Sequence, residues 1–104
     1  MPTYYFTAAS EQFLLQEEPV EEILRERLRF YNENNLTIDF WLTKKTNILQ
    51  IPEISAIKNN IRGDLVAIIS TNPTFINWLK LRLQYVITGT FSMNNSTDIL
   101  QYVQ

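Results

Sequence analysis

The chain has 104 residues, of which 45% are hydrophobic and 19% are charged, and its formal net charge is −2. These values are typical of one small folded domain, residues 1–104, with no overall attraction to nucleic acid. The chain has no cysteine and no histidine, so it lacks the usual thiol nucleophile, the usual general base and the commonest metal ligands, which disfavours triad hydrolases, zinc enzymes and histidine-ligated haem proteins.

Two elements are predicted in the first third of the chain. Residues 3–9 alternate between two faces and predict a β-strand. After a connector at residues 10–16, Pro19 opens a predicted helix that ends near Asn34. The buried stripe of this helix comprises Val20, Ile23, Leu24, Leu28 and Tyr31.

Charged residues crowd the same helix. Its first turn carries Glu17, Glu18, Glu21 and Glu22, which a solvated, dipole-favoured turn explains better than a metal site. Its second half carries Arg25, Arg27 and Arg29. These arginines could bind an anion, but the adjacent glutamates favour a solvated face with local ion pairs.

The middle of the chain predicts two more strands. Residues 36–43 alternate, so a second strand should place Phe40 in the core, and Asp39 and Trp41 on the opposite face. Pro52 opens a short predicted helix over residues 53–60. Residues 65–70 are apolar on both faces, which predicts a central strand covered on both sides.

The clearest helix pattern covers residues 71–89. Asn72 suits the N-cap, Pro73 suits the first helical position, and Gly89 is expected to close the helix. The predicted apolar face comprises Phe75, Ile76, Leu79, Leu83, Val86 and Ile87, with Trp78 and Tyr85 on its flank. Arg82 falls inside this apolar arc, so it needs a charged partner, an aromatic ring, or an opening to another molecule.

The pattern weakens after the glycine. Residues 90–93 predict a short edge strand, and residues 98–104 predict either a short helix or part of a loosely ordered tail that begins near residue 92. No apolar run reaches the roughly 18 residues that span a bilayer. The order of elements predicts a single α+β domain, with a small, mainly antiparallel sheet of three or four strands packed with helices.

Asp39 and Arg82 are charged residues that these patterns place beside apolar surfaces. The two could form a bidentate ion pair at the border of the core. Alternatively, each could present its charge on a binding surface, because aromatic and arginine side chains together are favoured at protein–protein contacts. The aromatic members of that surface would be Phe40, Trp41, Trp78 and Tyr85. The residues alone leave these two interpretations evenly balanced.

Three blocks of the sequence resemble a family found in cyanobacteria and plastids. The blocks are YYFTAASEQFLLQEEPVEEILRER, IDFWL and AIISTNPTFINWLKLRLQYVITG, and the resemblance covers residues 3–91. The family is the accessory subunit of the aerobic magnesium-protoporphyrin IX monomethyl ester oxidative cyclase, the enzyme that closes the fifth ring of chlorophyll. The resemblance implies a non-catalytic subunit, without a metal or cofactor of its own, that binds and supports the catalytic di-iron subunit.

The resemblance also implies a location and an interaction site. The location would be the plastid stroma or the cyanobacterial cytoplasm, with membranes reached only through the complex and other chlorophyll-biosynthesis enzymes as further partners. The interaction site would include Asp39, Phe40 and Arg82, at which the family's motif is intact. This role for Phe40 differs from the core position that the alternation predicts. A tetrapyrrole-binding carrier or sensor of the same pathway remains the alternative function, and only scattered carboxylates favour an enzyme.

Overall fold

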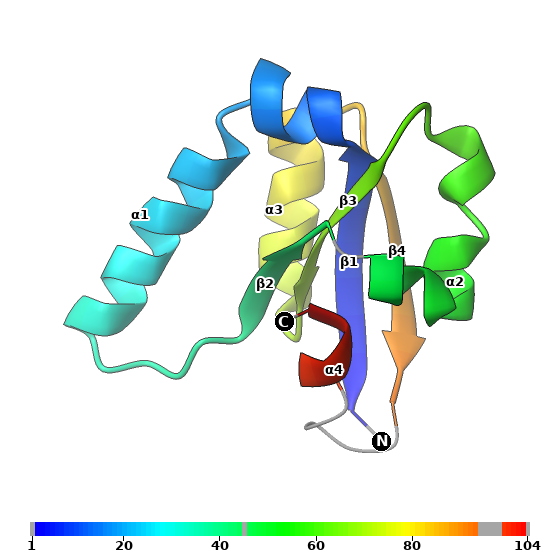
Figure 1. Cartoon of the computed structure of the whole chain (residues 1–104). Helices are drawn as coiled ribbons and strands as arrows, with labels where there is room; N and C mark the ends of the chain where they lie inside the picture. The colour runs from blue at the N-terminus through cyan, green and yellow to red at the C-terminus, as the bar shows by residue number, and fades with distance from the viewer. Residues whose placement is uncertain (1, 45, 94–98, 104) are drawn as a thin grey trace.

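A computed structural model describes residues 2–44, 46–93 and 99–103. Four strands form one antiparallel sheet in the order β2-β3-β1-β4 (Figure 1). The strands are β1 (Thr3–Ser10), β2 (Phe40–Thr43), β3 (Leu65–Ser70) and β4 (Ile87–Ser92). The predicted α+β class is confirmed, and β3 is a central strand buried along its whole length, as its apolar sequence indicates.

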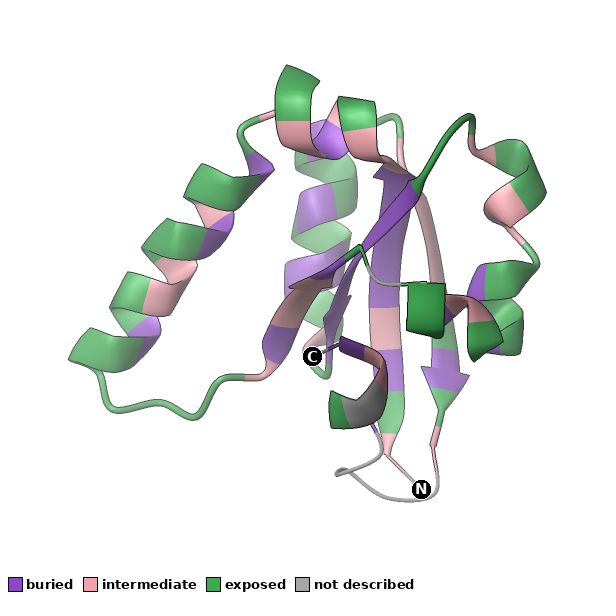
Figure 2. Ribbon diagram, viewed as in Figure 1, coloured by how far each residue is buried: buried purple, intermediate pink, exposed green. Residues whose placement is uncertain are grey.

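Helices cover both faces of this sheet. One face packs against α1 (Val20–Glu33), α3 (Pro73–Leu83) and the π-helical turn η1 (Gln12–Glu17). The other face packs against α2 (Pro52–Ser55), α4 (Leu100–Val103) and the 3₁₀ turn η2 (Thr46–Gln50). A second 3₁₀ turn, η3 (Lys58–Asn60), has no buried residue. The central strands are therefore buried on both sides, whereas the outer surfaces of the helices are exposed (Figure 2).

The alternation along the strands divides the core in two. The core under α2 and α4, here called the sealed core, includes Tyr4, Phe6, Ala8, Ile48, Ile54, Leu65, Ala67, Ile69, Phe91, Ile99 and Val103. The core under α1 and α3, here called the groove-side core, includes Leu14, Val20, Leu24, Tyr31, Phe40, Val66, Ile68, Phe75, Ile76, Leu79 and Leu83. Successive residues of one strand enter different cores, because side chains alternate across a sheet.

The helix α3 begins as predicted but ends earlier. Asn72 Oδ1 accepts hydrogen bonds from the backbone N–H groups of Thr74 and Phe75 at 2.9 and 3.2 Å. The helix ends at Leu83, because Gln84 takes φ +68° and ψ −51°. These angles make a γ-turn, a strained conformation for a residue with a side chain.

The predicted role of Gly89 as the helix terminator is therefore wrong. Gly89 lies within β4, opposite Phe6 of β1. A Cβ atom at this position would lie only 2.6 Å from Cζ of the Phe6 ring, so the strand needs glycine for this close approach. Val86 and Ile87 also lie outside the helix, and the predicted edge strand begins at Ile87 rather than residue 90.

Two further predicted elements differ from the structure, and the structure decides between the two alternatives for the C-terminus. The strand expected over residues 36–43 begins only at Phe40, and Leu36 and Ile38 are 47% and 43% exposed. The helix expected over residues 53–60 divides into α2 and η3. Of the two alternatives for the C-terminus, the structure contains the short helix, which buries Val103; residues 94–98 and 104 lie outside the described residues.

Candidate partner-binding site

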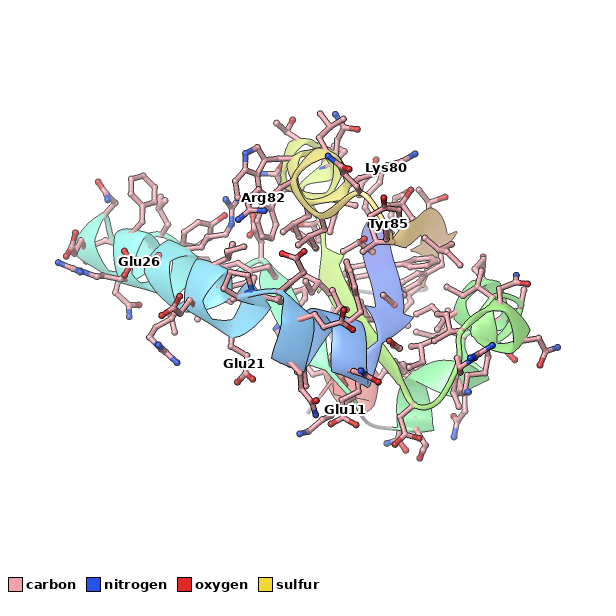
Figure 3. The ribbon with its side chains drawn as sticks, turned by 90° about the horizontal axis from the view of Figure 1, so that it is seen from above. Glu11, Glu21, Glu26, Lys80, Arg82 and Tyr85 are labelled. Atoms are coloured by element: carbon pink, nitrogen blue, oxygen red, sulfur yellow. The ribbon has the colours of Figure 1, made fainter. Side chains whose placement is uncertain are left out.

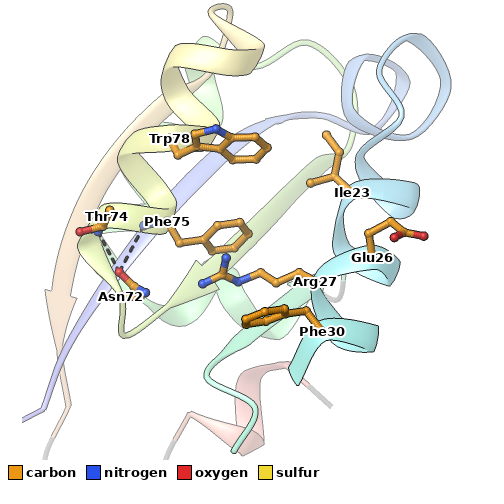
Figure 4. A pocket seen from close by; sticks show the side chains of 8 residues that line it. All are labelled: Ile23, Glu26, Arg27, Phe30, Asn72, Thr74, Phe75 and Trp78. Atoms are coloured by element: carbon orange, nitrogen blue, oxygen red, sulfur yellow. Dashed lines mark hydrogen bonds between the residues drawn. The ribbon is translucent and has the colours of Figure 1, made fainter. Parts of the chain in front are cut away.

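A groove runs between α1 and α3 (Figure 4). It encloses about 480 Å³ and is lined by Ile23, Glu26, Arg27, Phe30, Asn72, Thr74, Phe75 and Trp78. A hollow of about 350 Å³ shares part of this lining and continues the groove to Pro19. Trp78 and Phe30 are 47% and 56% exposed, so two large aromatic side chains border an open apolar channel, here called the α1–α3 groove.

The floor of the groove contains an arginine that is stacked on an aromatic ring. The guanidinium carbon of Arg27 lies 3.7 Å from the centroid of the Phe75 ring, and Figure 4 shows the Arg27 side chain reaching from α1 towards that ring. Arg27 Nη2 donates a hydrogen bond to the Tyr31 hydroxyl at 3.0 Å, and this hydroxyl donates to Asp39 Oδ1 at 2.8 Å. The Arg27–Tyr31–Asp39 chain therefore links α1 to the start of β2.

The environment of Tyr31 makes ionisation of its hydroxyl less favourable than in a free tyrosine. Burial is the main cause that raises the pKa of Tyr31 above its ordinary value, and the hydrogen bond to Asp39 acts in the same direction. The nearby Arg27 opposes this shift. At neutral pH the hydroxyl can therefore donate to the carboxylate and accept from the guanidinium at the same time.

Sequence patterns missed the role of Arg27. The solvated face expected for the three arginines is correct for Arg29, an exposed residue whose Nε lies 3.2 Å from Glu33 Oε1. It is wrong for Arg27, whose Nε atom is buried and has no hydrogen-bond partner in the described part of the chain. One signal was available: Arg27 lies four residues before Tyr31, so the two share a helix face.

Arg82 lies just beyond the Pro19 end of the groove, outside the residues that line it. Its guanidinium points from α3 towards α1 (Figure 3), and its Nη1 atom is 3.9 Å from Glu18 Oε2. The side chain is half-exposed. The ion pair between Arg82 and Asp39, one of the two predicted alternatives, is therefore wrong, because these residues bind Glu18 and Tyr31 respectively.

Phe40 lies behind the floor of the groove. It is 6% exposed, and its ring packs edge-on against Tyr31 and Phe75, with centroid separations of 5.3 and 5.8 Å. The core position predicted from the alternation is confirmed. Direct contact between Phe40 and a partner would thus need access through a neighbouring surface.

A second hollow provides such access at the edge of β2. It encloses about 790 Å³, and its lining includes Asp39, Phe40 and Trp41 beside Ile99. Trp41 belongs to the opposite face of the sheet and packs against the sealed core. We call this hollow the β2-edge hollow.

The six residues predicted for the site thus fall into three places. Trp78 lines the α1–α3 groove, and Arg82 lies one turn further along α3, beyond the residues that line it. Asp39, Phe40 and Trp41 border the β2-edge hollow. Asp39 and Phe40 also support the groove from behind, through Tyr31. Tyr85 stands apart, 80% exposed and beside Phe13.

The structure also bears on metal binding and on membrane insertion. In the part of the chain that the structure describes, no three acidic side chains converge to hold a metal ion. Within the same residues, no helix combines the length and the apolar character needed to cross a membrane.

Comparison with known proteins identifies related chains. The family model described as Ycf54 protein matches residues 2–93. An uncharacterized ycf54 protein of Pyropia yezoensis is 54% identical over 90% of this chain and 85% of its own. The chloroplastic protein YCF54 of Arabidopsis thaliana is 37% identical over 93% of this chain and 46% of its own.

Solved structures of related proteins share the fold. The All0216 protein of Nostoc sp. PCC 7120 has a TM-score of 0.84 and 51% identity, over 98% of this chain and 94% of that one. The Ycf54 protein of Synechocystis sp. PCC6803 has a TM-score of 0.83 and 46% identity, over 100% of this chain and 96% of that one.

Proposed function

The chain belongs to the Ycf54 family, and from this premise we propose that it is a non-catalytic subunit that binds and supports the di-iron oxidative cyclase of chlorophyll synthesis. The cyclase converts magnesium-protoporphyrin IX monomethyl ester to protochlorophyllide. One relative is the Ycf54-like protein of the cyanobacterium Synechocystis, and another is named as chloroplastic. A place in the plastid stroma or the cyanobacterial cytoplasm, at the membrane only through its partner, belongs to the same proposal.

The α1–α3 groove is the observation that carries this proposal. Folded proteins seldom leave large aromatic side chains together on an open channel unless another molecule covers them. Trp78 and Phe30 flank this channel, and arginine side chains lie at its floor and at one end. Tryptophan and arginine are the residues most enriched among energetically dominant contacts between proteins.

The roles proposed for the predicted residues differ with their positions. Trp78 and Arg82 would touch the partner directly, because both are about half-exposed. Asp39 and Phe40 would act from behind the groove, because they hold Tyr31 and Phe75 in place. A substitution of either of these two would then disturb docking through the shape of the groove.

Co-purification tests the proposal. A tagged form of the chain, expressed in cells that make chlorophyll, should recover the di-iron subunit, and the other chlorophyll-biosynthesis enzymes should follow in smaller amounts. Recovery of unrelated proteins alone would contradict the proposal. Purified chain should carry no iron and should not turn over the ester by itself.

The β2-edge hollow favours a second candidate, a tetrapyrrole carrier or sensor. Its volume of about 790 Å³ lies in the range of small-molecule sites, and aromatic side chains line it. Titration with magnesium-protoporphyrin IX monomethyl ester should then quench the fluorescence of Trp41 in a Trp78→Phe variant. A saturable change would support this candidate, and unchanged absorbance and fluorescence would rule against it.

A further inference from the structure

We infer that the α1–α3 groove receives one amphipathic helix of the partner, with an apolar face turned into the groove and lysine or arginine residues beside α1. This inference rests on the proposed function and adds which face of the chain is used and what kind of segment occupies it. It depends on three features of the groove: its walls, its length and the charge of its rim.

The walls determine the backbone conformation of the occupant. Both walls are α-helices, whose backbone groups are bonded within each helix. The groove therefore offers no strand edge with which an extended peptide could pair. A segment that enters an apolar groove must satisfy its own backbone hydrogen bonds, and an α-helix does so internally.

The length of the groove fits a short helix. The apolar lining extends from Pro19 to Phe30 along α1, through the two connected hollows. At about 1.5 Å per residue, this distance is roughly 16 Å, or three helical turns. Two anchor side chains of the partner would fit, one beside Phe30 and Phe75, the other beside Pro19, with Trp78 between them.

The rim determines the charge of the occupant. Glu22 and Glu26 both line the α1 side of the groove, one turn apart, and both are exposed. Glu26 lies 4.0 Å from Arg29, and both of these side chains are mostly in solvent. The attraction between them is therefore weak, and the carboxylate of Glu26 stays open to a partner. Arg82 is paired with Glu18. Arg27 keeps its positive charge on the floor of the groove, where it stacks on Phe75 and donates to Tyr31. The two carboxylates make the exposed α1 rim acidic, and basic residues on the partner helix complement them.

Site-specific photo-cross-linking tests this inference in the full chain. The photo-reactive residue p-benzoylphenylalanine replaces Phe30 or Trp78 in the groove, or Leu81 or Tyr85 outside it, all four of them exposed positions. The tagged variants are irradiated in chlorophyll-making cells, and the linked peptides are identified by mass spectrometry. The groove positions should link to a segment of the di-iron subunit that has apolar residues at three- and four-residue spacing and adjacent lysine or arginine.

Three results would overturn the inference while the proposed function stands. The di-iron subunit could link only at the control positions. The segment linked in the groove could be acidic or lack helical periodicity. The groove could link to a second copy of this chain. Absence of the di-iron subunit from the wild-type preparation would instead contradict the proposed function, and with it this occupant.

A matched pair of charge reversals gives a second readout. Glu22→Lys should reduce recovery of the di-iron subunit about five-fold or more, because it places a lysine against the basic side of the helix. Glu53→Lys makes the same change in the first turn of α2, on the opposite face of the sheet, and should leave recovery unchanged. Equal recovery with both variants, or greater loss with Glu53→Lys, would overturn the inference.

Discussion

The two faces of the sheet bury similar sets of aliphatic and aromatic residues, but they meet solvent in different ways. On one face, Phe6 and Phe91 pack with the residues of α2 and α4 in the sealed core. On the other face, α1 and α3 cover a core of the same kind and leave a channel between them. Charged side chains reach the floor of that channel, where Arg27 and Asp39 flank Tyr31.

This difference indicates how the chain divides stability from recognition. A close-packed core stabilises the domain most when no polar group interrupts it. A recognition surface needs exposed apolar area together with charge. The part of the chain that forms it therefore contributes less to the stability of the domain. The sheet separates the two needs, because alternate residues of β1 and β3 serve opposite faces.

The largest expected effect concerns aromatic truncation on the two faces. Phe6→Ala should lower the free energy of unfolding by about 3–5 kcal/mol, because it leaves a cavity in a closed core. Trp78→Ala should lower it by only about 1 kcal/mol, since nearly half of that side chain is already exposed. Denaturant unfolding of both variants measures the contrast, and equal losses would remove the distinction between the faces.

Arg82→Ala should separate binding from stability. Removal of an arginine at a dominant contact should weaken association with the di-iron subunit by about 2 kcal/mol, or roughly 30-fold. The free energy of unfolding should change by less than about 1 kcal/mol, because the Glu18–Arg82 pair is long and half-exposed. Lys80→Ala, on an exposed position of the same helix, is the control for association. If Arg82→Ala unfolds the domain, Arg82 is structural and does not serve docking.

Arg27→Ala should act on the groove itself. Loss of the guanidinium stacked on Phe75, and of its hydrogen bond to Tyr31, should lower the free energy of unfolding by about 1–2 kcal/mol. Amide hydrogen exchange in α1 should accelerate more than in β1 or β3. Arg25→Ala, at an exposed position on α1, should change stability by less than about 0.5 kcal/mol. Similar values for the two arginines would mean that the stacking contributes nothing.

High pH should weaken the groove-side core through Tyr31. The pKa of Tyr31 is raised in the folded chain, so the folded state holds the proton more tightly than the unfolded state, whose value is about 10. Stability from this group is complete below pH 10 and is lost as pH rises above it. Tyr31→Phe should flatten this alkaline loss in denaturant unfolding, and the unsubstituted chain gives the slope for comparison. An unchanged slope in Tyr31→Phe would contradict the assignment.

The sequence patterns predicted the elements better than the contacts between them. The cap at Asn72 and the doubly covered β3 are local or periodic features, and both are confirmed. The predicted stripe of α1 is confirmed in part, because Ile23 and Leu28 are only partly buried. The end of α3 was misplaced, because the apolar period continues through Val86 and Ile87 into β4. Gly89 was misread for the same reason, since the ring that requires a glycine there belongs to a distant strand.

The site depended even more on contacts between distant residues. The sequence draws attention to aromatic and arginine side chains, but the residues that contact them lie far apart in the chain. One of the two balanced interpretations paired Asp39 with Arg82, whereas the structure gives Asp39 the Tyr31 hydroxyl, with Arg27 behind. Sequence spacing could place Arg27 and Tyr31 on one helix face, but only the packing of α1 against Phe75 shows what they do together.

The two tryptophans of the chain lie on different surfaces, so their protection shows which surface the di-iron subunit covers. Trp78 borders the α1–α3 groove, and Trp41 borders the β2-edge hollow beside the sealed core. Hydroxyl-radical footprinting of the chain, free and bound to the di-iron subunit, measures the oxidation of each by mass spectrometry. Binding at the α1–α3 groove should protect Trp78 strongly and leave Trp41 unchanged. Protection of Trp41 with Trp78 still exposed would contradict docking at this groove.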